Sequence, residues 1–288
     1  MTAHQNGSIS TEFSDFLLNC FVRSPSWQLW LSLPLSLLFL LAMGVNTTLL
    51  ITIRLEASLH EPMYYLLSLL SLLDMALCLT VIPKVLAIFW FDLRSISFFA
   101  CFLQMFTMNT IFAMESCTFM VMAYDRYVAI CHPLSYLSII TVQFVVKAAI
   151  FISARSIFLT VPIPILSGRL HYCWENVIEN CLCANMSVSR LSCGDIIINC
   201  LYQFACGWTL LGLDLILIFL SYTLILRAHM WLPLHPDPLL QQKKVSSDVP
   251  VLLNILHHII PPALNPIVYG VRTQEIKQGI QRLLKKGW

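Results

Sequence analysis

Apolar residues form five long runs along the chain, each broken by only a few polar positions. They cover residues 27–53, 62–90, 99–130, 139–166 and 198–226. A helix needs about 20 mostly apolar residues to cross the hydrocarbon core of a bilayer, and every run exceeds that length. The pattern therefore predicts an all-α protein, a polytopic transmembrane helical bundle, in which residues 1–26 form an extracellular tail.

The pattern changes after residue 226. Residues 227–248 carry three prolines and the pair Lys243-Lys244. They exclude a lipid-facing helix, because lipid offers no partner for the backbone groups that proline frees. We expect an irregular linker there and a further, weakly apolar span at residues 249–271. For the tail after that span to be cytoplasmic, the linker would have to cross the membrane in extended form, sheltered in a protein groove. In residues 272–288 basic and apolar positions alternate, which predicts an amphipathic cytoplasmic helix on the inner leaflet, with a solvated helix as the alternative.

Composition agrees with a membrane protein. Hydrophobic residues make up 58% of the chain, charged residues 11%, and the mean hydropathy is +0.77. These values exceed those of a soluble fold of this length. A net charge of +2, without a basic patch interleaved with aromatics, argues against nucleic-acid binding. The expected partners are membrane lipid, small molecules and cytosolic proteins.

The segment before the first run has the features of an extracellular position. Asn6-Gly7-Ser8 is an acceptor for N-glycosylation, and Arg23 is offset by Glu12 and Asp15. The positive-inside bias therefore places this segment outside, and we predict a glycan on Asn6. Asn185-Met186-Ser187 is a second, weaker acceptor in a loop expected on the same side.

Charged residues gather at the inner end of the third run, where Asp125, Arg126 and Tyr127 precede Pro133. An ionisable group at membrane depth costs about 2.5 to 3.5 kcal/mol, so Arg126 needs a partner, and Asp125 is the nearest candidate. We expect the two to form a polar latch that opens and closes. The alternative is an Arg126 side chain that extends to the lipid headgroups.

Two further acids, Asp74 and Glu115, are expected at mid-membrane on consecutive runs. Glu115 precedes Arg126 by eleven residues, which places it on nearly the same helix face and about 16 Å further out. If Asp74 and Glu115 face each other, they would share a proton or bind a sodium ion, because both cannot stay ionised otherwise. The alternative is two protonated acids that act as hydrogen-bonding struts. We expect no other cofactor and no metal site.

Short motifs are spread over most of the chain. They are Pro62-Met63-Tyr64-Tyr65, Leu73-Asp74, Met114-Glu115-Ser116, the run from Asp125-Arg126-Tyr127 to His132-Pro133-Leu134, Ser221-Tyr222, and Asn265-Pro266-Ile267-Val268-Tyr269. Together they resemble the signatures of odorant (olfactory) receptors, which are rhodopsin-like G-protein-coupled receptors. Gly212-Leu213-Asp214, with Lys147 and Arg155, resembles the class I (fish-like) branch. The resemblance implies one seven-span receptor domain over residues 1–288.

The resemblance also implies two sets of functional residues. A small volatile or acidic odorant would bind beside the third span, at Met105, Met108, Asn109 and Phe112, with Asn109 as the polar anchor. Such a helical stripe is alternatively a packing surface. A heterotrimeric G protein would respond to the activation residues, which are Asp125, Arg126, Tyr127, Tyr222, Asn265, Pro266 and Tyr269.

Cysteines gather in the long loop after the fourth run, which faces an oxidising compartment in this topology. The family pattern implies the disulfides Cys101-Cys183 and Cys173-Cys193, which leaves Cys181 without a partner. The remaining cysteines are expected to be free thiols: Cys20, Cys78, Cys117, Cys131, Cys200 and Cys206.

The sixth span of the family has no counterpart in this sequence, since residues 227–248 occupy its place. Two functions follow: an odorant receptor of the cell membrane that couples to a G protein, or a receptor-derived protein that does not signal and is retained in the endoplasmic reticulum. A transporter is disfavoured because inverted repeats are not found. An enzyme is also disfavoured, because His257-His258 lacks metal-ligand spacing and no nucleophile constellation exists.

Overall fold

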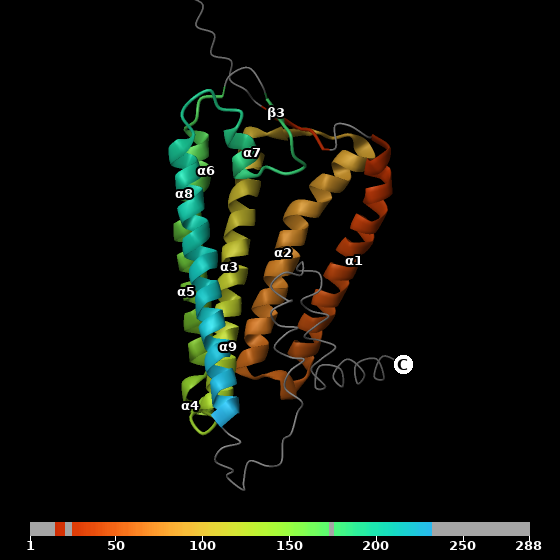
Figure 1. Cartoon of the computed structure of the whole chain (residues 1–288). Coiled ribbons are helices and arrows are strands. Elements are labelled where there is room, and N and C mark those ends of the chain that lie inside the picture. The colour runs from red at the N-terminus through yellow and green to blue at the C-terminus, as the bar shows by residue number, and fades with distance from the viewer. Residues whose placement is uncertain (1–14, 21–24, 173–175, 232–288) are drawn as a thin grey trace, which may run out of the picture.

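The computed structural model describes residues 15–20, 25–172 and 176–231 (Figure 1). Its helices and strands, in chain order, are β1 (Asp15–Leu18), α1 (Pro25–Leu55), η1 (Ala57–Leu59), α2 (Pro62–Phe91), β2 (Ser95–Ser97), α3 (Phe98–Cys131), α4 (Tyr136–Ile139), α5 (Val142–Thr160), α6 (Pro162–Gly168), β3 (Val177–Ile178), α7 (Asn185–Ser189), α8 (Ile197–Gly207), η2 (Trp208–Gly212, a π-helical turn) and α9 (Leu213–Trp231).

The five predicted spans are confirmed. Helices α1, α2 and α3 are each continuous, α5 and α6 together form the fourth span, and α8, η2 and α9 form the fifth. All five are long and apolar enough to cross a membrane, which makes the chain a multi-pass membrane protein. The fourth span is divided into α5 and α6 just before Pro162, because proline cannot donate a backbone hydrogen bond to the preceding turn.

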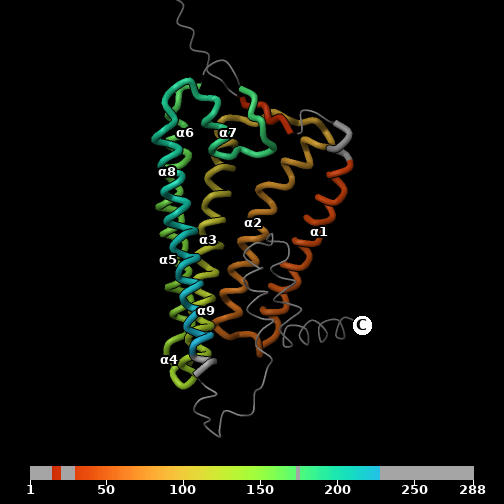
Figure 2. Tube along the Cα trace, in the orientation of Figure 1, coloured from red at the N-terminus to blue at the C-terminus, as the bar shows by residue number. Residues whose placement is uncertain are grey.

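Helix α3 occupies the centre of the bundle. It packs against α2 on one side and against α5 and α9 on the other, while α1 packs against α2 (Figure 2). Two groups of buried side chains hold these helices together: an outer cluster that includes Cys101 and Met105, and an inner cluster that includes Leu67 and Cys117. Because α3 contributes to both clusters, it determines the relative positions of its neighbours.

A small three-stranded sheet closes one end of the bundle, with the strand order β2-β1-β3. β1 pairs antiparallel with β2 and parallel with β3. Its side chains alternate between buried and exposed, and Phe16 and Leu18 enter the outer cluster. The apolar runs did not predict this sheet, because strands of two to four residues are too short to show a periodicity.

Candidate functional site

Disulfide bonds mark the outer end of the bundle. Cys101, at the start of α3, is bonded to Cys183, with a Cα–Cα distance of 5.4 Å. This is the pairing that the family pattern implied. Both residues are fully buried, so the bond attaches the long loop to the central helix. The compartment on this side is oxidising, and the opposite end of α3, with Asp125 and Arg126, therefore faces the cytoplasm.

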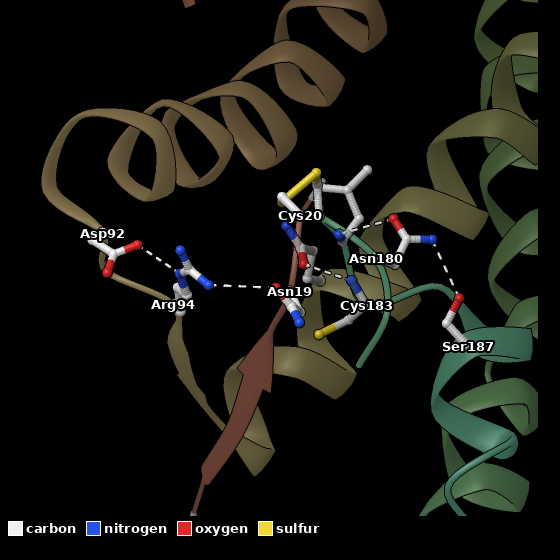
Figure 3. The surroundings of a disulfide bond; sticks show 10 residues. Asn19, Cys20, Asp92, Arg94, Asn180, Cys183 and Ser187 are labelled. Atoms are coloured by element: carbon white, nitrogen blue, oxygen red, sulfur yellow. Dashed lines mark hydrogen bonds and ion pairs between the residues drawn. A yellow bond between two sulfur atoms is a disulfide. The ribbon is translucent and has the colours of Figure 1, made fainter. Parts of the chain in front are cut away.

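A second disulfide joins Cys20 to Cys181, with a Cα–Cα distance of 4.8 Å (Figure 3). The predictions of a free Cys20 and an unpaired Cys181 were wrong. The bond forms because β1 lies beside β3, which brings together two residues that are 161 positions apart in the sequence. The neighbouring Asn19 receives a hydrogen bond from Arg94 at 3.4 Å, so the segment is also attached to the loop after α2.

The other cysteines mostly agree with expectation. Cys193 is disulfide-bonded, whereas Cys173 lies outside the described residues, so the Cys173-Cys193 pairing stays a prediction. The structure confirms five free thiols, at Cys78, Cys117, Cys131, Cys200 and Cys206.

Asn185, in the second glycosylation motif, is part of a buried polar network and is 2% exposed. Its amide nitrogen donates to Asn199 at 3.3 Å and to Gln203 at 2.6 Å, and its amide oxygen accepts from Ser167 and Ser189. A glycan would be attached to that same nitrogen. Asn185 is therefore a structural residue in this fold, and the first motif, at Asn6, lies outside the described residues.

The four predicted ligand contacts lie along the outer half of α3. Met105 is fully buried in the outer cluster, and Met108 packs against a smaller group around Leu73 and Leu77. Asn109 is partly buried and donates its amide hydrogen to the Met105 carbonyl at 2.7 Å. Phe112 is 48% exposed. Packing therefore accounts for Met105, while the other three keep accessible surface.

Asp74 and Glu115 meet at the interface between α2 and α3. They are 1% and 6% exposed, and their carboxyl groups are close enough to interact. One Glu115 carboxyl oxygen, Oε1, has no hydrogen-bond partner among the described residues. The two acids therefore face each other, which is the arrangement that a shared proton or a bound cation requires.

The inner end of α3 differs from the predicted latch. Asp125 is 1% exposed and accepts a hydrogen bond from the Tyr136 hydroxyl at 3.0 Å, whereas Arg126 donates to the thioether of Met63. The ion pairs within the described residues are Arg94-Asp92 and Arg155-Asp214, so the Asp125-Arg126 pair is not formed. Adjacent residues on a helix point about 100° apart, so each side chain finds a partner on a different neighbouring segment.

Tyr136 lies in α4, between the third and fourth spans, and burial together with Asp125 raises its pKa to about 12. The neutral hydroxyl is favoured in the folded state. The protonated Tyr136 hydroxyl therefore stabilises the fold fully below about pH 10, the pKa of an ordinary tyrosine. This stabilisation is lost as the pH rises toward 12.

We expect Tyr136→Phe to lower the stability of the purified protein by about 1–3 kcal/mol, because Asp125 then stays buried without its hydroxyl donor. The measurement is the thermal unfolding midpoint near neutral pH. Tyr65→Phe is the matched control, because Tyr65 is 37% exposed. Equal midpoints for the two variants would show that the Tyr136 hydroxyl does not hold Asp125 in place.

A charged cluster joins three spans at mid-membrane. The Arg155 guanidinium contacts both carboxyl oxygens of Asp214, at 3.0 and 3.1 Å. Ser116 donates to Asp214 at 2.9 Å, and Arg155 also donates to the Thr209 carbonyl in the π-helical turn at 3.1 Å. The side chains of Arg155 and Asp214 are only 17% and 1% exposed. The cluster therefore links α3, α5 and the fifth span through buried polar contacts.

Comparison with known proteins assigns the family. A family model described as "Olfactory receptor" matches residues 35–237 and 240–287. The chain belongs to the olfactory receptor family. Olfactory receptor 56A3 of Homo sapiens is 71% identical over 314 aligned residues, with 100% of both chains covered. Olfactory receptor 56A1 of Homo sapiens is 66% identical, covering 99% and 98% of the two chains. Olfactory receptor 56B34 of Mus musculus is 41% identical, covering 97% and 95%.

Some activation residues of this olfactory receptor lie beyond the described part of the chain. These are Asn265, Pro266 and Tyr269. Tyr222 lies on α9, is partly buried and takes part in an interaction with another group. Asp125, Arg126 and Tyr127 lie together at the inner end of α3, where Tyr127 approaches His132 at 3.4 Å.

Sequence reasoning noted Arg155 and Asp214 separately and missed their contact in this olfactory receptor. A usable signal was present. Arg155 lies thirteen residues after Val142, where α5 begins at the inner side of the membrane. Asp214 lies thirteen residues before Arg227, and Arg227 marks the inner end of the fifth span. At 1.5 Å per residue, both lie about 20 Å from the inner ends of their spans. Opposite charges at equal depth predict a pair, because each is costly to bury alone.

Proposed function

We propose that this chain binds a small volatile or acidic odorant beside α3 and passes the signal to a heterotrimeric G protein at the inner end of the bundle. Its membership of the olfactory receptor family is the observation that carries the proposal. The position of Asp125, Arg126 and Tyr127 at the cytoplasmic end of α3 supports the coupling site. The receptor would act in the cell membrane, with its disulfide-bonded loop outside.

The ligand would contact Met108, Asn109 and Phe112. A thioether, an amide and an aromatic ring offer apolar contact and one polar anchor, which suits small ligands with few hydrogen-bonding groups. Asn109 uses one amide hydrogen for the Met105 carbonyl, and among the described residues its amide oxygen and second hydrogen have no partner, so they could contact a ligand.

Asp74 and Glu115 would share a proton or bind a sodium ion inside the receptor. Two facing carboxyl groups that are 1% and 6% exposed cannot both stay ionised without a cation, which supports one shared proton or one bound ion. Either occupant would stabilise the contact between α2 and α3.

We expect Asp74→Asn and Glu115→Gln each to lower the thermal unfolding midpoint. The double variant should lower it by less than the sum of the two single losses, because each substitution removes the charge that repels the other carboxylate. Sodium chloride and N-methylglucamine chloride distinguish the two occupants. A midpoint that rises only with sodium identifies the ion. Strictly additive losses in both salts would eliminate a shared site.

A difference in aligned length motivates a second candidate function, a receptor-derived protein that does not signal. The 71% identical relative aligns over 314 positions, 26 more than the 288 residues of this chain, and the family match is interrupted between residues 237 and 240. In this proposal most of the sixth span is missing. Activation would then lack the helix whose displacement lets Arg126 approach Tyr222. Without that helix the chain has no second state, and a ligand can shift an equilibrium only between two states that it binds differently.

A chimera tests both functions. The segment of Olfactory receptor 56A3 that has no counterpart here is inserted at the interruption, and cyclic-nucleotide output is measured across an odorant panel for the chain and the chimera. We expect the chimera to respond, Asn109→Ala in the chimera to reduce the response, and the unmodified chain to stay silent. A dose-dependent response of the unmodified chain would refute the second candidate, and a silent chimera that reaches the surface would refute the first.

A further inference from the structure

An apolar groove opens on the perimeter of the bundle, between α3, α5 and α9, in the half of the membrane nearer the cytoplasm. Its volume is about 510 Å³, within the range of small-molecule sites. Its walls include Tyr124 and Tyr127 of α3, Phe144, Lys147 and Phe151 of α5, and Leu220 of α9. The predicted odorant contacts are not among its lining residues, so the groove is distinct from the proposed odorant site.

The polarity of the groove changes with depth in the membrane. Lys147 lies five residues after Val142, about 8 Å from the inner end of α5, and Phe151 lies about 6 Å further toward the membrane centre. Side chains on a helix tilt toward its amino terminus, which directs Lys147 to the cytoplasmic side. The inner end of the groove is therefore cationic, and the walls beyond it are apolar.

Lys147 differs from the other cation of α5. The guanidinium of Arg155 is held by Asp214, whereas no ion pair of Lys147 is found within the described residues. Lys147 is exposed and lies at the depth where ammonium groups extend to the lipid headgroups. A negatively charged group at this point would neutralise it without competing with an internal contact.

We propose that this groove binds one anionic phospholipid of the inner leaflet. The phosphate would contact the Lys147 ammonium, and one acyl chain would lie against Phe144, Phe151 and Leu220. An anionic lipid fits better than an uncharged sterol or a second copy of the chain, because the groove combines a single cation at its cytoplasmic end with apolar walls toward the membrane centre. Phe151 and Leu220 are 55% and 51% exposed in the bundle, so a bound acyl chain of the lipid would cover apolar surface on two spans at once.

Native mass spectrometry of the full chain tests the proposal. The detergent-purified protein is mixed with phosphatidylserine or with phosphatidylcholine, and the fraction that carries one lipid is measured over a concentration series. We expect one phosphatidylserine per chain, and about tenfold weaker retention for Lys147→Gln, which corresponds to about 1.4 kcal/mol. Lys147→Arg should retain the lipid. Arg169→Gln, which removes a charge at the outer end of the same span, should also retain it.

A second variant tests the apolar part of the site without changing charge. Ala148 lines the groove, and Ala148→Phe should reduce retention of phosphatidylserine severalfold while leaving Lys147 in place. Equal retention of the two lipids, equal losses for Lys147→Gln and Arg169→Gln, or a dimer that disappears in Ala148→Phe would each overturn the proposal. The thermal midpoint of Lys147→Gln should match that of the parent chain, because the side chain is exposed.

Discussion

Replacing Cys101 with serine is expected to reduce delivery of the receptor to the cell surface more than replacing Cys181. The Cys101-Cys183 bond attaches the long loop to α3 at a fully buried position, and removing a native disulfide typically costs about 2–5 kcal/mol. Serine would also place a hydroxyl in the apolar outer cluster. Staining of non-permeabilised cells measures the surface fraction.

The Cys20-Cys181 bond makes a separate prediction that concerns additivity. Cys20→Ser, Cys181→Ser and the double variant should lose the same fraction of surface delivery, because all three remove the same single disulfide bond. Combining Cys20→Ser with Cys101→Ser should instead add two losses. Cys200→Ser is the matched control, because Cys200 is a free thiol. A loss for Cys181→Ser with no effect of Cys20→Ser would contradict the pairing.

Removing the guanidinium of Arg155 is expected to have the largest effect among the charged positions of the spans. In Arg155→Met, Asp214 stays buried without its cation, which costs about 3–5 kcal/mol. The double variant Arg155→Met with Asp214→Leu should recover much of that loss, because it removes both charges together. Unfolding of the purified protein, followed by intrinsic fluorescence during heating, measures the change.

Two further variants separate charge from geometry at this site. Arg155→Lys keeps the charge and loses the two-point contact with the carboxylate, so an intermediate loss is expected. Arg169→Met is the control, because an exposed substitution changes stability by about 0.5 kcal/mol or less. A double variant as unstable as Arg155→Met alone would show that the ion pair does not account for the effect.

The spans were predictable because the rule behind them is local. A run such as 62–90 needs only its own apolar residues to be placed in lipid, and the observed helix Pro62–Phe91 differs from it by one residue. The inner end of α3 was located in the same way. The partners of Asp125 and Arg126 were not, since Tyr136 lies 11 positions from Asp125 and Met63 lies 63 positions from Arg126.

The sequence by itself determined the membrane class, the five spans, the family and the residues that carry its signature, because apolar length and short motifs are read from neighbouring positions. Only the tertiary structure decided which distant groups meet. β1 places Cys20 beside Cys181, and the packing of α5 against the fifth span joins Arg155 to Asp214. A side chain buried in lipid or in a core takes the nearest suitable partner in space, and spacing along the chain does not specify that partner.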